Sequence, residues 1–242
     1  MDEKIKDFQN SIIAVIILFA VICSAFITSD AIKKEGITVT GSAYKLVKSD
    51  TGLLRLDIKT KSVDKSTAYN LIQSKIPVVK EYLISQGVEE SEITILTPNN
   101  YPTYKFDPRT GYSTNQIDSY NFSQVIQIKS SDVEKIKELS LNVQSLLDKG
   151  IDVNVNAPQY YYSKLGEIKV ELLKEASEDA KQRAKGMLSA TNNKVGKIRS
   201  VRMGVFQITP PDSNDVSDLG MNDVSSIEKK VTAVANVVFG IK

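Results

Sequence analysis

The sequence predicts an α+β fold with a mostly antiparallel sheet and about three packed helices, preceded by one N-terminal transmembrane helix. Three observations support this prediction: a long uncharged segment near the N-terminus, several runs of alternating apolar residues, and three stretches with apolar residues at every third or fourth position. With 242 residues, 41% of them hydrophobic, the chain can bury a core. We assign residues 1–35 to a membrane anchor with a short linker, and residues 36–242 to one domain.

The N-terminal segment has the length and composition of a membrane-spanning helix. No residue from Phe8 to Ser29 is charged, and about 20 apolar residues in a helix span roughly 30 Å. A cleaved signal peptide would begin with a net positive charge, whereas acidic residues offset the lysines here. We therefore predict an uncleaved signal-anchor that crosses the lipid bilayer through residues 8–29. Lysines flank both sides of this segment equally, so charge alone does not orient it.

The first half of the domain should contain strands, one helix and a long hairpin. Alternating apolar residues in 37–47 and 54–58 predict two strands, which we expect to pair. Asp64 can cap the next segment, a helix with the apolar stripe Tyr69, Ile72, Ile76, Val79 and Leu83, which Pro77 should kink. Residues 93–98 and 122–128 are further strands, and the intervening arm, with turn chemistry in DPRTG, predicts a hairpin.

The second half should contain two more helices and the last strands. Ser131 and Glu134 form a capping-box signature before the stripe Val133, Ile136, Leu139, Val143 and Leu146. A third helix should start near Ser163, and its stripe of Ile168, Leu172, Ala176, Ala180 and Ala184 permits close approach of another backbone. Strands are predicted in 201–208 and 231–239, the latter buried on both faces. The polar residues 210–226 between them predict a mobile or functional loop.

The composition excludes several classes of function. Histidine is absent and the only cysteine, Cys23, lies in the apolar N-terminal segment, so the usual Ser-His-Asp and Cys-His nucleophile systems cannot form. The sequence has no Gly-rich phosphate-binding loop, and the spacing of acidic residues in PDSNDVSDLG does not match a calcium loop. The net charge of +2 comes from interspersed charges, which argues against nucleic acid as a partner. We predict no enzyme activity, cofactor or metal site.

Tyrosines provide the candidate interface. Most of them fall between residues 101 and 162, and tyrosine is both enriched at protein interfaces and favoured in ordinary strands. The arm has two prolines and many polar residues, and it lacks the sustained apolar alternation of a strand packed on both faces. We expect the arm to project and to act in self-association. The candidate interface residues are Tyr101, Tyr104, Tyr112, Tyr120 and Tyr161.

Four stretches together resemble the SIMPL-domain family. They are the opening ITVTG, a helix ending in QGV, the segment TPNNYPTYKFDPRTGY, and AKGMLSATNNKVGKIRSV. The likeness covers residues 37–239, and bacterial members of the family are often described as periplasmic immunogenic or oxidative-stress-defence proteins. The resemblance implies an exported α+β domain behind a signal or anchor, ring-like oligomers in some members, and no established catalytic residues.

These observations predict a non-catalytic envelope protein. Its membrane anchor would hold an extracytoplasmic SIMPL-like domain that acts as a scaffold or by self-assembly into a homo-oligomer. The resemblance adds a stress-related role to this expectation. The alternative is a binding module for a small ligand or another protein in stress defence. The sequence names neither the protein partner nor the number of subunits.

Overall fold

The computed structural model describes residues 16–22 and 36–242. From Gly36 on, these residues form two compact units, each assembled from segments distant in the sequence. Unit 1 comprises 36–43, Glu171–Val205 and Ala233–Lys242, and unit 2 comprises Tyr44–Val170 and Phe206–Thr232. The assignment of residues 36–242 to one functional domain stays a prediction.

The predicted anchor, residues 8–29, lies outside the described residues except for the helical residues 16–22. In the part of the chain that the structure describes, no helix is both long enough and apolar enough to span a bilayer.

Unit 2 is built around an antiparallel sheet whose central strands are β2 (Thr51–Ser62) and β5 (Tyr112–Ser130). The strand order is β3 (Ile93–Ile95), β5, β2 and β6 (Val153–Val155). Two further strands extend this sheet: β4 (Asn99–Asp107) pairs with β5, and β7 (Gln159–Tyr161) pairs with β2. The buried residues Leu54, Leu56 and Ile58 of β2 confirm the predicted alternation.

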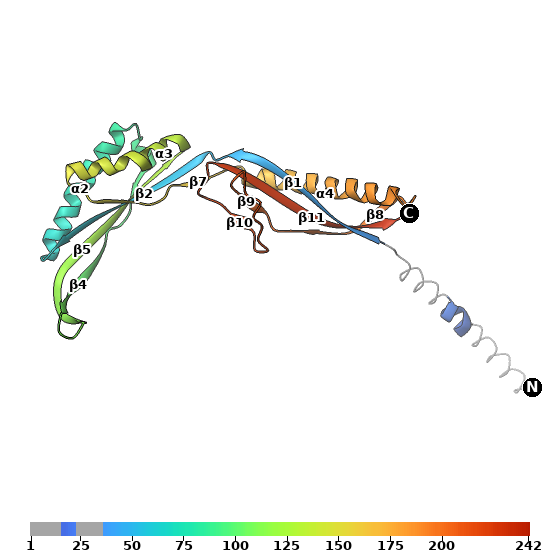
Figure 1. Ribbon diagram of the computed structural model, residues 1–242, viewed down its shortest axis with the longest axis horizontal. Coiled ribbons are helices and arrows are strands. Elements are labelled where there is room, and N and C mark those ends of the chain that lie inside the picture. The colour runs from blue at the N-terminus through green and yellow to red at the C-terminus, as the bar shows by residue number, and fades with distance from the viewer. Residues whose placement is uncertain (1–15, 23–35) are drawn as a thin grey trace, which may run out of the picture. The chain divides into compact units, whose positions relative to one another are not determined.

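Helices α2 (Lys65–Ser85) and α3 (Val133–Asn142) pack on this sheet, as Figure 1 shows. The helix α2 continues through Pro77, and its predicted stripe is buried except for Tyr69, whose ring meets Phe122 edge-on at 5.7 Å. The stripe predicted from Val133 to Leu146 is fully buried, although its second half is a 3-10 helix, η2 (Val143–Lys149). Asp132, and not Ser131, caps α3, because its carboxylate accepts a hydrogen bond from Lys135 N.

The smaller elements of unit 2 are the 3-10 helix η1 (Glu90–Glu92) and two short strands. Strand β9 (Gln207–Thr209) pairs with β11 (Glu228–Ile241), and β10 (Met221–Asn222) runs parallel to β9. The predicted loop at 210–226 therefore contains a strand.

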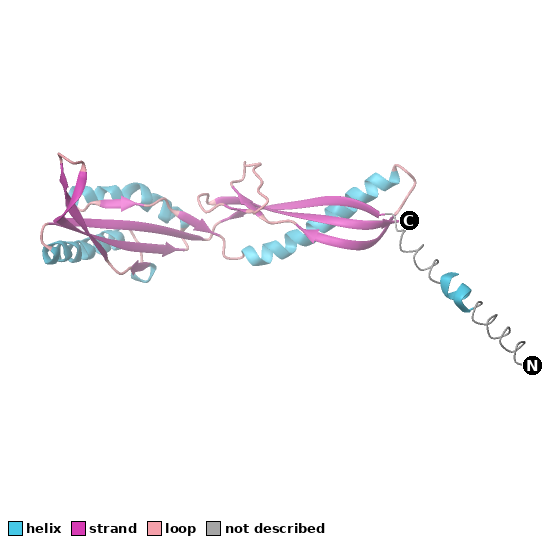
Figure 2. Cartoon of the chain, turned by 90° about the horizontal axis from the view of Figure 1, so that it is seen from below, coloured by secondary structure: helices cyan, strands magenta, loops and turns pink. Residues whose placement is uncertain are grey.

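Unit 1 contains β8 (Val195–Met203) and most of β1 (Gly36–Lys48), β11 and α4 (Leu165–Ser189). Strand β11 lies between β1 and β8, and α4 runs along these strands (Figure 2). The predicted stripe Ala176, Ala180 and Ala184 is buried. It lies so close to β1 that a Cβ on Gly41 would be 2.1 Å from Ala176 O, which confirms the predicted close backbone approach.

Two strand predictions need correction. The first two strands do not pair with each other, because β1 joins β11 in one sheet and β2 joins β5 in the other. Alternation identifies a strand but not its partner, and no Asn-Gly or Asp-Gly turn links these two. Strand β11 buries Val231, Ala233, Ala235, Val237 and Phe239, whereas Val234 and Val238 on its other face are only half-buried.

Candidate functional site

The tyrosine-rich arm is the β4–β5 hairpin. Its turn is fixed by Asp107, which accepts hydrogen bonds from Arg109 N at its carboxylate and from Gly111 N at its carbonyl. Gly111 has a φ of 75°, the left-handed conformation that glycine adopts readily. Asn121 Nδ2 donates to Thr103 Oγ1 across the two strands at 2.6 Å. The hairpin is thus an ordered structure, and its tip continues beyond α2 and α3 (Figure 1).

The hairpin exposes most of its aromatic side chains. The exposed fractions are 51% for Tyr101, 46% for Tyr104, 64% for Phe106 and 76% for Tyr112. We call these four residues the hairpin surface. Phe106 was not among the predicted interface residues, although it follows Tyr104 at the two-residue spacing of a strand face.

Of the other two predicted interface residues, Tyr120 lies on β5 of the same hairpin, opposite Pro102, and Tyr161 lies elsewhere. Tyr120 is half-buried and packs against the core of unit 2. Tyr161 lies opposite Thr51 on β2, whereas Tyr120 lies opposite Ser62 at the other end of the same strand. These two ends are about 37 Å apart at the strand rise of roughly 3.4 Å per residue. Tyr101, Tyr104, Tyr112 and Tyr120 therefore lie on the hairpin, and Tyr161 does not.

Strand β7 has tyrosines of opposite exposure. Tyr160 is buried and its N–H donates to Val224 O, while Tyr161 is partly exposed and its hydroxyl donates to Gln159 Oε1 at 2.9 Å. Burial raises the pKa of Tyr160, and the negative charge of Glu134 adds to this effect. The phenol therefore stays protonated at neutral pH.

An open groove of about 420 Å³ lies beside Tyr161. It is lined by Thr51, Leu53, Arg55, Gln127, Lys129, Tyr161 and Ser163. The two charged residues in this lining are both cations. The volume falls within the range of about 300–1,000 Å³ that is typical of small-molecule sites, so the groove could hold a small anion.

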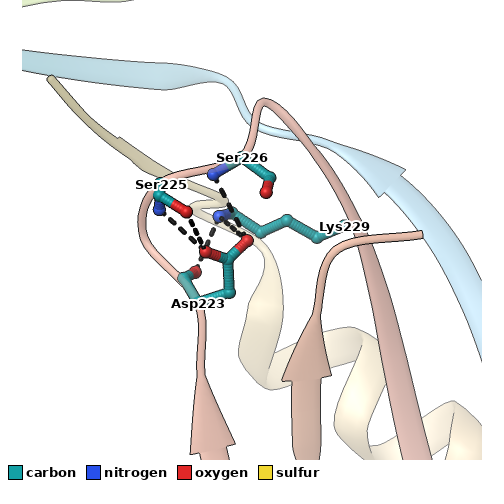
Figure 3. A network of polar contacts seen from close by, with 4 residues as sticks. All are labelled: Asp223, Ser225, Ser226 and Lys229. Atoms are coloured by element: carbon teal, nitrogen blue, oxygen red, sulfur yellow. Dashed lines mark hydrogen bonds and ion pairs between the residues drawn. The ribbon is translucent and has the colours of Figure 1, made fainter. Parts of the chain in front are cut away.

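The loop before β11 ends in a network of polar groups around the buried Lys229, drawn in Figure 3. Asp223 accepts hydrogen bonds from Ser225 N at 2.9 Å, Ser225 Oγ at 2.6 Å and Ser226 N at 3.3 Å. Lys229 Nζ donates to Asp223 O at 2.7 Å and lies 3.4 Å from Asp223 Oδ2. Only 3% of the Lys229 residue surface is exposed.

The pKa values of Asp223 and Lys229 are both lowered, but for different reasons. Burial opposes ionisation of Asp223, but the hydrogen bonds from Ser225 and Ser226 and the charge of Lys229 outweigh it and lower the pKa from 3.8 to about 2. For Lys229, burial lowers the pKa, and the attraction of Asp223 offsets this only in part. A cavity of about 150 Å³ adjoins the pair, which is smaller than the volume of about 300 Å³ at which most ligand sites begin. The network therefore has a structural role, in which Lys229 of β11 holds the loop at Asp223 in place.

The sequence analysis did not single out Lys229, although a signal was present. The buried stripe of β11 continues backwards by two residues from Val231 to Lys229, so the same alternation places this lysine on the buried face. Within the described ranges, no cluster of three or more His, Cys, Asp or Glu residues could hold a metal ion.

Comparison with known proteins places the chain in a family. No curated protein matches it. The model of the SIMPL family, described as a protein of unknown function (DUF541), matches residues 37–239. This match covers nearly all of the chain after the N-terminal segment and confirms the expected resemblance. The chain belongs to the SIMPL family.

Proposed function

We propose that this protein is a non-catalytic, membrane-anchored envelope protein whose extracytoplasmic part acts by self-association through the hairpin surface. The observation that supports the proposal most is the exposure of four aromatic side chains on one ordered hairpin. Aromatic residues contribute large contact area at interfaces, and exposed aromatic groups on a projecting element mark an interaction site.

A second copy of the chain is the partner that fits best. An anchor confines copies to one membrane and raises their local concentration, so a contact of modest size is sufficient. Strand β4 pairs with β5 alone among the described strands, which leaves an edge available. However, Pro102 and two register shifts in β4 disfavour continued strand pairing at that edge. The contact should therefore form through side chains.

Replacing Tyr104 and Tyr112 together by serine should break the oligomer and leave the thermal midpoint of the monomer nearly unchanged. Truncating an interface anchor costs about 2 kcal/mol or more, which corresponds to roughly 30-fold in the dissociation constant. Intact mass measurement of the solubilised full chain reports the oligomer. The matched control is Tyr44→Ser, since Tyr44 is 65% exposed but lies on β1.

Two outcomes would count against this interface. If the double variant keeps its oligomeric mass and loses monomer stability, these tyrosines belong to the core of unit 2. If the wild-type chain is monomeric at every concentration, self-association is wrong, and the groove beside Tyr161 makes the ligand-binding alternative the better one.

The proposed anchor and orientation make a separate prediction. The full chain should remain in the membrane fraction after a high-salt wash, because roughly 20 apolar residues hold it in the bilayer independently of charge. Protease added to intact spheroplasts should digest the chain beyond Gly36 while a cytoplasmic marker survives. Protection of the chain would reverse the orientation, and a mature N-terminus beyond Ser29 would show that the anchor is cleaved.

A further inference from the structure

One end of unit 1 is rich in basic residues. The sequence has no Asp or Glu in 36–43, 180–205 or 233–242, whereas 180–205 holds seven Lys and Arg residues and 233–242 holds Lys242. The acidic residues of unit 1 within Glu171–Val205 all precede residue 180. The basic residues nearest the turn between α4 and β8 and the C-terminus are Lys185, Lys194, Lys197, Arg199 and Lys242. We call these five residues the basic end.

Backbone contacts place the members of the basic end together. Lys194 and Lys242 exchange two backbone hydrogen bonds of 2.8 and 2.9 Å, which join the start of β8 to the end of β11. A Cβ on Gly36, the first residue of β1, would lie 3.4 Å from Arg199 Nη1. The side chains of Lys185, Lys194 and Lys197 are exposed. Figures 1 and 2 both show the C-terminus beside the start of β1.

The basic end also lies where the chain passes from the proposed anchor into unit 1. Only residues 30–35 separate Ser29 from Gly36. A fully extended chain covers about 3.5 Å per residue, so Gly36 lies within roughly 25 Å of the end of the uncharged segment. This tether allows the basic end to reach the membrane surface. Attraction to anionic headgroups acts over about 8 Å at physiological ionic strength.

Strand β8 begins at the basic end and also exposes apolar side chains. Ile198, Val201 and Met203 are 56%, 45% and 63% exposed, and they pair with residues on the buried face of β11. The basic residue between the last two, Arg202, pairs with the exposed Asn236 and therefore lies on the other face. The choice of a lipid surface over a nucleic acid thus rests on the short chain segment between the basic end and the proposed anchor.

We infer that the basic end binds the anionic headgroups of the membrane that holds the chain, so that unit 1 rests against the bilayer surface. This inference rests on the proposed membrane anchor. It adds an orientation for unit 1 and a dependence on lipid charge, neither of which follows from the anchor alone.

The test measures contact of the basic end with headgroups in the full chain. A Cys23→Ser background carries one fluorophore at Ala190→Cys, in the exposed turn between α4 and β8, or at Thr110→Cys in the hairpin turn as the control position. The chain is reconstituted in vesicles of phosphatidylcholine, or in vesicles with one third phosphatidylglycerol, each with a headgroup-quencher lipid. Retention of the chain in the vesicles after an alkaline wash is measured in parallel.

Quenching at position 190 should increase in the phosphatidylglycerol vesicles and return to the neutral-lipid level near 1 M NaCl, where the screening length is about 3 Å. Each lysine near an anionic surface contributes about fivefold to the equilibrium. The variant Lys185→Gln, Lys194→Gln, Lys197→Gln should therefore reduce the surface-bound fraction by on the order of 10-fold or more. The matched variant Lys65→Gln, Lys137→Gln, Lys164→Gln in unit 2 should have no effect.

Three results would overturn the inference. Quenching that is independent of lipid charge, in chains that stay in the vesicles, refutes it while leaving the anchor intact. Loss of the chain from the vesicles in the alkaline wash refutes the anchor and the inference together. Binding of a labelled DNA duplex that the triple variant loses, without any response to lipid charge, would assign the surface to nucleic acid.

Discussion

A valine in place of Gly41 is expected to unfold unit 1. A Cβ at this position would lie 2.1 Å from Ala176 O and 2.3 Å from Ala180 N. Both atoms belong to the backbone of α4, so no side-chain rotation can relieve the clash, and the helix itself would have to move away from β1. Overpacking a core costs about 1–3 kcal/mol when side chains can adjust, and we expect at least the upper value here.

Hydrogen exchange followed by mass spectrometry checks this prediction unit by unit. Peptides from β8 and β11 should lose protection in Gly41→Val, whereas peptides from β2 should keep it. Gly186→Ala is the matched control on the same helix, because nothing lies within 4 Å of a Cβ there. That substitution should stabilise the chain by about 0.5–1 kcal/mol, since alanine favours a helix over glycine. Normal protection of β8 and β11 in Gly41→Val would mean that α4 is not held against β1.

Replacing Lys229 by methionine is expected to destabilise unit 2 by about 3–5 kcal/mol, the typical cost of removing one partner of a buried ion pair. The substitution removes the donor to Asp223 O and leaves a carboxylate with little access to water. Thermal and urea unfolding of the full chain measure the loss. In the background Asp223→Asn the same replacement should cost less, because no charge is then left unpaired. Equal losses in both backgrounds would show that the two residues do not interact.

The same pair predicts an acid-dependent loss of stability. The pKa of Asp223 is 3.8 when the chain is unfolded and about 2 in the fold. A carboxyl group whose pKa is lowered by folding makes its full contribution to stability when the pH is above its pKa in the unfolded chain. For Asp223 this contribution is lost as the pH falls from near 3.8 through about 2. The contribution amounts to about 2 kcal/mol. Asp223→Asn should therefore flatten the stability curve in this pH window.

The sequence predicted helices better than it predicted strand partners. A helix buries one stripe against its surroundings, and the stripe is visible in local spacing whatever the helix packs on. The stripes ending at Leu146 and Ala184 were therefore correct. The expected pairing of the first two strands was wrong, since β1 and β2 find their partners far along the chain and local alternation contains no information about distant partners.

The sequence predicted the site residues correctly only where their exposure follows from the residues next to them in the chain. Prolines, polar residues and a turn motif indicated that Tyr101, Tyr104 and Tyr112 lie on a hairpin. They did not show that Tyr120 packs on the core, because the core residues come from segments distant in the sequence. Lys229 was missed for a different reason. A charged residue at the start of a strand is usually solvated, and the sequence does not show that the chain between Asp223 and Lys229 folds back so that the two form a buried ion pair.

The position of β11 between β1 and β8 determines when unit 1 can form during synthesis. Thr40 on β1 donates a hydrogen bond to Asn236 on β11, a residue 196 positions later. The ribosome must therefore release the chain through β11 before this sheet has its central strand, and contacts between such distant residues form slowly. Until then β1 has no partner on that side, and a nascent chain that stalls before residue 228 would expose it to chaperones and proteases.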